Sequence, residues 1–466
     1  MRPPSSPSEA GPSGAIPAEA GPATGLFDGV LGRGPVAAEV DDAAWLRALL
    51  DVEAALARAG ATAGLVPSSA AEEIGDACRG TFDPAALGRD AAASGNPVVP
   101  LVRAIEAACS AQAGPWVHRG ATSQDVLDTA MVLVARRAVA ALLVDLEAAS
   151  TAAEALARRH RDHPVSGRTL LQQALPTTFG LKAAGWMTAL DGAADRLTDV
   201  CRSLPVQLGG AVGTMSALEG RGTTVLEALA AELDLAVPVL AWHTLRLPVA
   251  DLAGALGTAA GVLGKVALDL ALLAQTEVAE VAEGVAGRGG SSTMPHKRNP
   301  VAAVSARAGA MRAPGLVAGL LGAMAQEHER AAGAWHAEWE ALSDLLRCTG
   351  SSAAWLRDGL EHLEVDADRM REGLAGAALG SEAVALALTG SLGRARAHDV
   401  VAAAVAADAG APGGPDLRAR LLADADVSAT LTPQQVDQLL DPAVHAGEAP
   451  RLVDRALAAH EQRSRP

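Results

Sequence analysis

Apolar residues recur at intervals of three and four positions over most of the chain, which is the spacing of an amphipathic α-helix. Residues 41–60 show the pattern with acidic residues at the start and a glycine at the end. Longer segments of the same kind cover residues 122–161, 179–201, 248–283 and 300–332. Each of these exceeds the mean helix length of globular proteins, which is about 11 to 12 residues. The pattern predicts an all-α fold built around a bundle of long helices.

The predicted helices group into three domains. Shorter segments fill residues 25–112, the long segments fill residues 113–360, and the segments shorten again over residues 361–466. Apolar faces as extensive as those of the central domain favour packing against other subunits. Residues 1–24 are rich in Pro, Ser, Gly and Ala and lack the apolar run of a secretory signal, so they are expected to form a flexible tail.

Composition supports a helical, soluble protein. Hydrophobic residues make up 50% of the 466 positions, Ala and Leu dominate, and Tyr is absent, which favours helices over sheets. The formal net charge of -16 argues against nucleic acid as a partner, because binding to phosphates needs a basic surface. The same charge means that an anionic substrate needs a local cationic pocket.

The cysteines and the apolar segments indicate a cytoplasmic location. The four cysteines are widely scattered, as expected in a reducing compartment: Cys78, Cys109, Cys201 and Cys348. Charged residues interrupt the most apolar region, residues 251–283, before an uncharged run reaches the roughly 18 residues that a membrane span needs. We therefore expect no contact with a membrane.

Several common active-site motifs are missing. The sequence has no G-x-S-x-G nucleophile elbow and no H-E-x-x-H zinc helix. Gly264 and Lys265 do not form a phosphate-binding loop, because Ala259 stands where its first glycine is needed. His328 and His336 lie eight residues apart, which is not a common spacing of metal ligands. Neither a metal nor a cofactor is expected.

Four polar loops between the predicted helices carry the candidate chemistry. Each combines a cationic side chain with hydroxyl or amide donors, and they cover residues 117–125, 167–173, 242–246 and 289–300. Taken singly, Thr122 and Asn299 could be helix caps and the arginines could be solvated. Taken together, the loops could surround a polycarboxylate with charge-assisted hydrogen bonds.

Two of these loops resemble a known family. GGSSTMPHKRNP, residues 289–300, resembles the signature loop of the fumarase/aspartase superfamily, and HRGATSQDVLDTA, residues 118–130, resembles its first active-site segment. The likeness runs from about residue 25 to residue 460. Within the superfamily, the chain is similar to the bacterial 3-carboxy-cis,cis-muconate cycloisomerases in GLFDGVLGRGPVAAEVDDAAWLRALLDVEAALARAG, TTFGLKAAGW, QLGGAVGT, AWHTLR and QEHERAAGAWHAEWEAL.

The resemblance implies a homotetramer whose active sites are shared between subunits and closed by a mobile signature loop. It implies an intramolecular lyase that acts on a small tricarboxylate, without a cofactor. Ser291 would be the acid/base, while His118 and His243 are further candidates that could instead be structural. His328 and Trp335 could shape the pocket. The implied substrate-binding residues are Thr122, Ser123, Gln124, Arg168, Thr169, Gln172, Arg246, Met294, His296, Lys297 and Asn299.

Departures from the family pattern bear on the substrate. Leu170 stands where the eliminating lyases usually have a histidine that protonates the leaving group, and AAGAWHAEW after Arg330 lacks the phosphate-binding residues of adenylosuccinate lyases. Both favour the cycloisomerases. Arg119 in place of an aromatic residue and Leu247 in place of an aspartate fit them less well. The alternatives are elimination from a succinate derivative with release of fumarate, and a non-catalytic protein that kept the fold.

Overall fold

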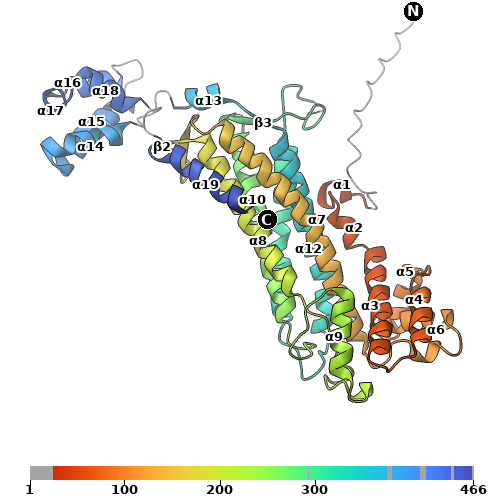
Figure 1. Ribbon diagram of the computed structural model, residues 1–466. Helices are drawn as coiled ribbons and strands as arrows, with labels where there is room; N and C mark the ends of the chain where they lie inside the picture. The colour runs from red at the N-terminus through yellow and green to blue at the C-terminus, as the bar shows by residue number, and fades with distance from the viewer. Residues whose placement is uncertain (1–24, 292, 375–379, 410–415, 442–445, 464–466) are drawn as a thin grey trace, which may run out of the picture.

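The computed structural model describes residues 25–291, 293–374, 380–409, 416–441 and 446–463, so the predicted tail at residues 1–24 lies outside the described residues. Most of the described chain is helical, as predicted (Figure 1). The first helices are α1 (Asp28–Leu31), α2 (Val36–Glu39), α3 (Asp42–Thr62), α4 (Ser68–Ala77), α5 (Pro84–Ala91) and α6 (Val98–Ala108).

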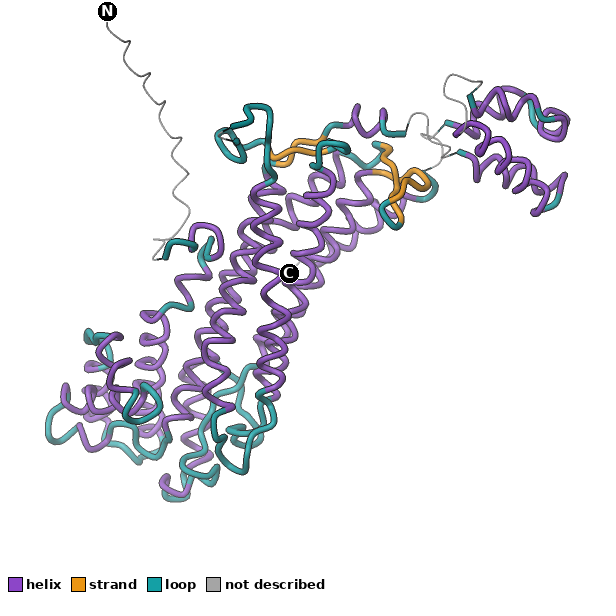
Figure 2. The backbone as a smooth tube through the Cα atoms, turned by 180° about the vertical axis from the view of Figure 1, so that it is seen from behind, coloured by secondary structure: helices purple, strands orange, loops and turns teal. Residues whose placement is uncertain are grey.

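Five long helices run side by side through the centre of the molecule (Figures 1 and 2). They are α7 (Ser123–Arg159), α8 (Phe179–Ser203), α10 (Leu247–Leu273), α11 (Val301–Gly322) and α12 (Ala334–Glu361). α7 packs against α8 and α12, while α11 packs between α10 and α12. The shorter α3 and α9 (Gly222–Leu233) lie against one end of this bundle. The predicted bundle of long helices is confirmed.

Two of the long helices end earlier than the sequence pattern predicts. α10 stops at Leu273 rather than continuing to residue 283, because the chain turns at Ala279 with a φ of 52° and the amide of Glu280 donates back to the carbonyl of Leu273. α11 stops at Gly322 rather than at residue 332, and the following loop includes His328 with a φ of 45°. Both endings place polar segments at the ends of the bundle.

Four short strands were not predicted by the all-α interpretation. β1 (Pro164–Thr169) and β2 (Gln172–Thr178) form an antiparallel hairpin, and β3 (Val281–Glu283) pairs antiparallel with β4 (Leu363–Val365). The strands are too short and too polar to show a clear alternating pattern. The turn of the hairpin also lacks the Gly and Asn residues that usually indicate one.

Two separate apolar cores stabilise the described chain. The larger core joins the N-terminal helices to the long bundle, and it includes Val453 and Leu457 of α19 (Ala449–Arg463), which packs on α8. A smaller core lies apart from it (Figure 1). It is built from α14 (Ser381–Leu392), α15 (Arg394–Ala409), α16 (Leu417–Ala423), α17 (Ala425–Thr430) and α18 (Pro433–Leu440), which follow α13 (Ala367–Glu372).

The helix α10 is long and apolar enough to cross a membrane by length and composition alone. In the fold it packs against α8, α11 and α12, and the residues of its inward side, such as Leu256 and Leu263, are fully buried. We therefore describe α10 as a core helix of the bundle.

A buried ionic network joins three of the long helices at one end. Arg246, at the start of α10, is fully buried and donates two hydrogen bonds to Asp128 of α7, at 2.7 and 3.0 Å. Its other N–H groups donate to Glu338 of α12, at 2.6 and 3.1 Å. Trp335 Nε1 adds a 2.9 Å hydrogen bond to Asp128. Such a network is stable only while both carboxylates keep their cation, because an isolated buried charge is strongly disfavoured.

We expect the Arg246→Leu variant to lose about 3–5 kcal/mol of folding stability, since it leaves Asp128 and Glu338 buried without their counter-ion. Urea unfolding followed by circular dichroism measures the change. The control is Arg158→Leu, which removes a 47% exposed arginine beside Glu154 and is expected to cost about 0–1 kcal/mol. Equal losses in the two variants would contradict a structural role for the buried network.

Candidate active site

The predicted polar loops lie at two opposite ends of the bundle. The 37 residues of α7 span roughly 55 Å, and this length separates the two ends. We call them the Thr122 end, with residues 117–125, 207–215, 242–246 and 326–335, and the Ser291 end, with residues 164–178 and 280–300. Within one chain, the first and third loops therefore share the Thr122 end, and the second and fourth share the Ser291 end.

Hydrogen bonds show that the loops of the Thr122 end converge. The carboxylate of Asp125 accepts the backbone N–H groups of Gly209 and Gly210, both at 2.9 Å. The hydroxyl of Thr244 donates to the carbonyl of His328, at 2.9 Å. Arg330 joins three of the loops, donating to Gln124 Oε1 at 2.7 Å and to the carbonyl of Ala211 at 2.6 Å, among other contacts.

The start of α7 is capped as the sequence predicts. Thr122 is the N-cap residue, and its backbone N–H donates to Asp125 Oδ2 at 2.9 Å in a capping box. Ser123 is the first residue of the helix, and both Thr122 and Ser123 are partly exposed. The N-terminus of a long helix favours anions, and these two side chains add hydroxyl donors to it.

Two other predicted ligands at this end are already engaged inside the protein. Gln124 donates to the carbonyl of His243 at 2.8 Å and to Asp128 at 3.1 Å, and its oxygen accepts from Arg330. Arg246 is enclosed in the ionic network. Both side chains are buried. We therefore assign them the role of holding the loops in place rather than the predicted contact with substrate.

The two candidate histidines differ in how open they are. His243 is buried, and its Nε2 lies 2.6 Å from Asp125 Oδ1, so we assign it a positioning role. The side chain of His118 is 18% exposed, and its Nδ1 lies 2.7 Å from Glu53 Oε1. Among the described residues, Nε2 of His118 has no hydrogen-bond partner, so this nitrogen is open to a ligand.

The signature loop, residues 289–300, is closed at its base. The backbone and side-chain N–H groups of Asn299 both donate to the carbonyl of Gly289 at 2.9 Å. Gly289 has a φ of 78°, and a Cβ there would lie 2.3 Å from the carbonyl oxygen of Asn299. This close approach requires a glycine, since a side chain would collide with the other strand of the loop base.

Asn299 does not cap the following helix, contrary to the sequence-based alternative. The carboxylate of Glu283 accepts the N–H groups of Ala302 and Ala303 at 3.1 and 3.0 Å and so caps α11 instead. Pro300 occupies the N-cap position. The side chain of Asn299 instead closes the loop base by donating to Gly289, ten residues earlier in the chain. No helix-cap pattern indicates a contact over this separation.

Ser291 lies just inside the closed base of the loop and is partly exposed. Its hydroxyl oxygen accepts the backbone N–H of Met294 at 3.2 Å and faces that of Thr293 at 3.4 Å. Backbone donors of this kind stabilise a serine alkoxide, as the proposed acid/base needs. Further along the loop, Met294, His296 and Lys297 are exposed, and no ion pair within the described chain neutralises Lys297.

The hairpin at the Ser291 end carries the remaining predicted ligands. Thr169 and Gln172 face each other across its tip and are exposed. Between them, Leu170 and Leu171 adopt φ values of 51° and 65°, a left-handed conformation that costs about 1–2 kcal/mol per residue. Leu170 is 96% exposed. Arg168 is paired with Glu280 at 2.6 and 2.9 Å, which fixes the hairpin to the segment before β3.

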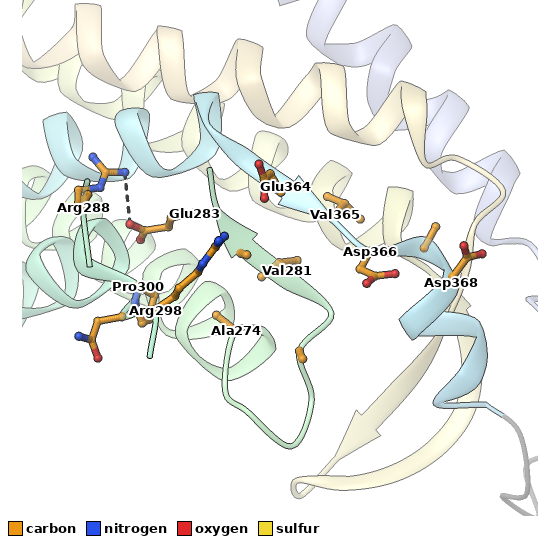
Figure 3. Close-up of a pocket in the computed structure, with 14 residues that line it drawn as sticks. Ala274, Val281, Glu283, Arg288, Arg298, Pro300, Glu364, Val365, Asp366 and Asp368 are labelled. Atoms are coloured by element: carbon orange, nitrogen blue, oxygen red, sulfur yellow. Dashed lines mark ion pairs between the residues drawn. The ribbon is translucent and has the colours of Figure 1, made fainter. Parts of the chain in front are cut away.

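A cavity of about 630 Å³ lies beside the base of the signature loop, and Arg298 extends across it toward β3 (Figure 3). Its lining includes four carboxylates: Glu283, Glu364, Asp366 and Asp368. Ser291 and Lys297 are not among its lining residues. These four carboxylates outnumber the two guanidinium groups of the lining, Arg288 and Arg298, and the net negative charge disfavours a carboxylate substrate. We therefore do not assign this cavity to substrate. Among the residues that the structure describes, no cluster of three metal-ligating side chains occurs.

The sequence predictions missed Glu53 and Arg330 as residues of the site. Both fall inside stretches that carried the family resemblance, but neither lies within a predicted polar loop. Arg330 reaches the site from the segment after α11, and Glu53 reaches it from the buried side of α3. Trp335 is buried in the ionic network, whereas His328 is exposed at the same end.

Comparison with known proteins identifies the family. The family model described as lyase matches residues 35–315, and that of the adenylosuccinate lyase C-terminus matches residues 378–456. The chain is 46% identical to the 3-carboxy-cis,cis-muconate cycloisomerase of Pseudomonas aeruginosa, covering 94% of this chain and 97% of that protein. It is 45% identical to the nitrosuccinate lyase of Streptomyces davaonensis, covering 94% and 95%.

A solved structure agrees with this match. The crystal structure of the 3-carboxy-cis,cis-muconate lactonizing enzyme from Pseudomonas putida superposes with a TM-score of 0.87 at 40% sequence identity, covering 94% of this chain and all of that one. The similarity of fold and the sequence identity over nearly the whole chain agree. The chain belongs to the fumarase/lyase superfamily.

Proposed function

We propose that the chain is an intramolecular lyase that interconverts 3-carboxy-cis,cis-muconate and its carboxymuconolactone, in the protocatechuate branch of aromatic catabolism. The observation that carries the proposal is Ser291, whose oxygen faces two backbone N–H groups in a loop that also presents an unpaired Lys297. The similarity to cycloisomerases over nearly the whole chain supports this choice of substrate.

The reaction asks for proton transfer and for stabilisation of negative charge. In lactonisation, an oxygen of one substrate carboxylate adds to a conjugated double bond, and the electron pair moves onto the carbon beside another carboxylate. The Ser291 hydroxyl then gives its proton to that carbon, and in the reverse direction the alkoxide removes it. Lys297 would bind the carboxylate that becomes a dianion. Its attraction to this carboxylate is then stronger in the transition state than in the ground state.

The separation of the two ends implies that one chain does not hold a complete site. Ser291, Met294, His296, Lys297 and Asn299 belong to one end, while Thr122, Ser123 and His118 lie at the other, roughly 55 Å away along α7. We infer a homotetramer in which different subunits supply these segments, together with Thr169 and Gln172 of the hairpin. We infer a cytoplasmic enzyme that needs no cofactor.

A second function has support of its own. The nitrosuccinate lyase relative is as similar to the chain as the cycloisomerases are. Elimination from nitrosuccinate would also begin with proton removal beside a carboxylate, and it would release fumarate and nitrite. Nitrite is a stable anion that leaves without being protonated. Leu170 stands where the eliminating lyases usually have a proton-donating histidine, and it therefore suits this reaction as well as lactonisation.

An assay with both substrates separates the two functions. We expect the muconate absorbance to fall when the enzyme is mixed with 3-carboxy-cis,cis-muconate, with at least a hundredfold lower kcat/KM on nitrosuccinate. Fumarate and nitrite are measured in the second reaction. Rapid formation of both, with no loss of muconate, would replace the cycloisomerase by the eliminating lyase. A protein that acts on neither substrate would contradict both functions.

The Ser291→Ala variant is expected to lower kcat by roughly 10²–10⁴-fold, the usual contribution of a general acid/base. Its mass in light scattering and its circular dichroism should match those of the wild type, because the loop base is closed by Asn299 rather than by Ser291. The control is Ser428→Ala, the same change at an exposed position in α17. Turnover within threefold of the wild type would remove Ser291 from the mechanism.

A further inference from the structure

Glu53 lies at the Thr122 end although it belongs to the N-terminal helix α3. It is 1% exposed, and its Oε1 lies 2.7 Å from Nδ1 of His118, 65 residues further along the chain. Its second oxygen, Oε2, is also buried and has no hydrogen-bond partner in the described chain. A carboxylate in such a place needs a positive partner, and His118 is the group in contact with it.

The backbone fixes the ring of His118 against this carboxylate. His118 has a φ of 58°, a strained conformation for a residue with a side chain. Gly120, two residues later, has a φ of 80° and packs so closely on Leu218 that a Cβ would lie 2.1 Å from it. The turn therefore has little freedom to move. It directs Nδ1 to Glu53 and leaves Nε2 open.

The charges around His118 favour its protonated form. Burial by itself lowers the pKa of His118, but the charge and hydrogen bond of Glu53 outweigh burial and raise the pKa above its ordinary value. Asp125 of α7 and Glu106 of α6 add smaller effects in the same direction. The other histidine–carboxylate pair, His243 with Asp125, differs because it is buried and its carboxylate also accepts backbone N–H groups.

We propose that Glu53 is a positioning residue that keeps His118 as an imidazolium with Nε2–H directed outward, where it binds a carboxylate of the substrate. The inference rests on the proposed function in one respect, namely that the substrate is a polycarboxylate. His118 is then a binding group with a fixed charge, rather than a base. The N-terminal helix α3 takes part in the site through Glu53.

The first test measures the pKa of His118 directly. Hydrogen–deuterium exchange at the imidazole C2 position, read by mass spectrometry, reports the titration of each histidine in the intact protein. We expect the wild-type pKa of His118 to exceed the ordinary value of about 6.5, and to fall below it in Glu53→Gln. The matched control is Glu106→Gln, an exposed carboxylate, which should change this pKa much less.

The second test measures binding of tricarballylate, an unreactive tricarboxylate, by calorimetry. The imidazolium is present below its pKa, so wild-type affinity should fall as pH rises through the raised pKa of His118. At pH 7, Glu53→Gln should bind roughly tenfold more weakly, the equivalent of one charge-assisted hydrogen bond. Glu53→Asp, which keeps the charge, should restore part of this affinity.

Several outcomes would overturn the proposal. One is a wild-type pKa of His118 at or below about 6.5, which needs no variant and stands even where Glu53→Gln fails to fold. Another is a folded Glu53→Gln protein in which the pKa of His118 and the affinity for tricarballylate are both unchanged. Neither measurement involves turnover, so the two proposals can fail separately. A wild-type protein that does not convert muconate but shows the expected titration of His118 would contradict the proposed substrate and still support the role of Glu53.

Discussion

The Arg246 guanidinium, enclosed between Asp128 and Glu338, is the contact on which the Thr122 end depends. It joins the N-cap of α10 to the second turns of α7 and α12, and the loops that precede those helices carry the polar groups of the site. Desolvation of three charges is costly, and it is offset here by close, multiple hydrogen bonds. Because each partner is held by the others, Gln124 and Trp335 are fixed as well through their bonds to Asp128. A rigid base of this kind is what a binding site needs when its ligand-facing groups lie on loops.

The opposite end is built differently. Its ion triad, in which Arg288 pairs with Glu283 and Asp358, is partly exposed rather than fully enclosed. Its polar groups lie on the tip of a hairpin and on a loop closed only at its base. Leu170 and Leu171 are exposed and adopt a left-handed conformation, so the backbone at the tip of the hairpin is strained. One end of the bundle is therefore rigid and preorganised, and the other presents its chemistry on segments with few contacts within the chain. Complementary ends of this kind are well suited to meet in an assembly of several copies.

The sequence predicted those features that depend on local patterns. Four of the five long helices follow from their apolar spacing, whereas α12 was not among the predicted segments. The cap of α7 follows from Thr122 and Asp125, which lie three residues apart. Features that depend on distant residues could not be predicted in this way. The early end of α10 is set by the turn at Ala279 and the return of Glu280 to Leu273. Nothing near His118 in sequence indicates Glu53 as its partner. Arg246 resembled a ligand because the sequence shows its charge but not its burial.

The uninterrupted length of α7 has a consequence for how this fold can vary. A helix turns by about 100° and rises about 1.5 Å with each residue. One residue inserted into α7 would thus rotate the hairpin by about 100° relative to Thr122, and even seven inserted residues would move it about 10 Å along the axis. No insertion or deletion inside the helix is geometrically neutral. The number of residues between the two ends is therefore itself a property of the shared active site that we propose, even though none of the side chains in the middle of α7 reaches either end.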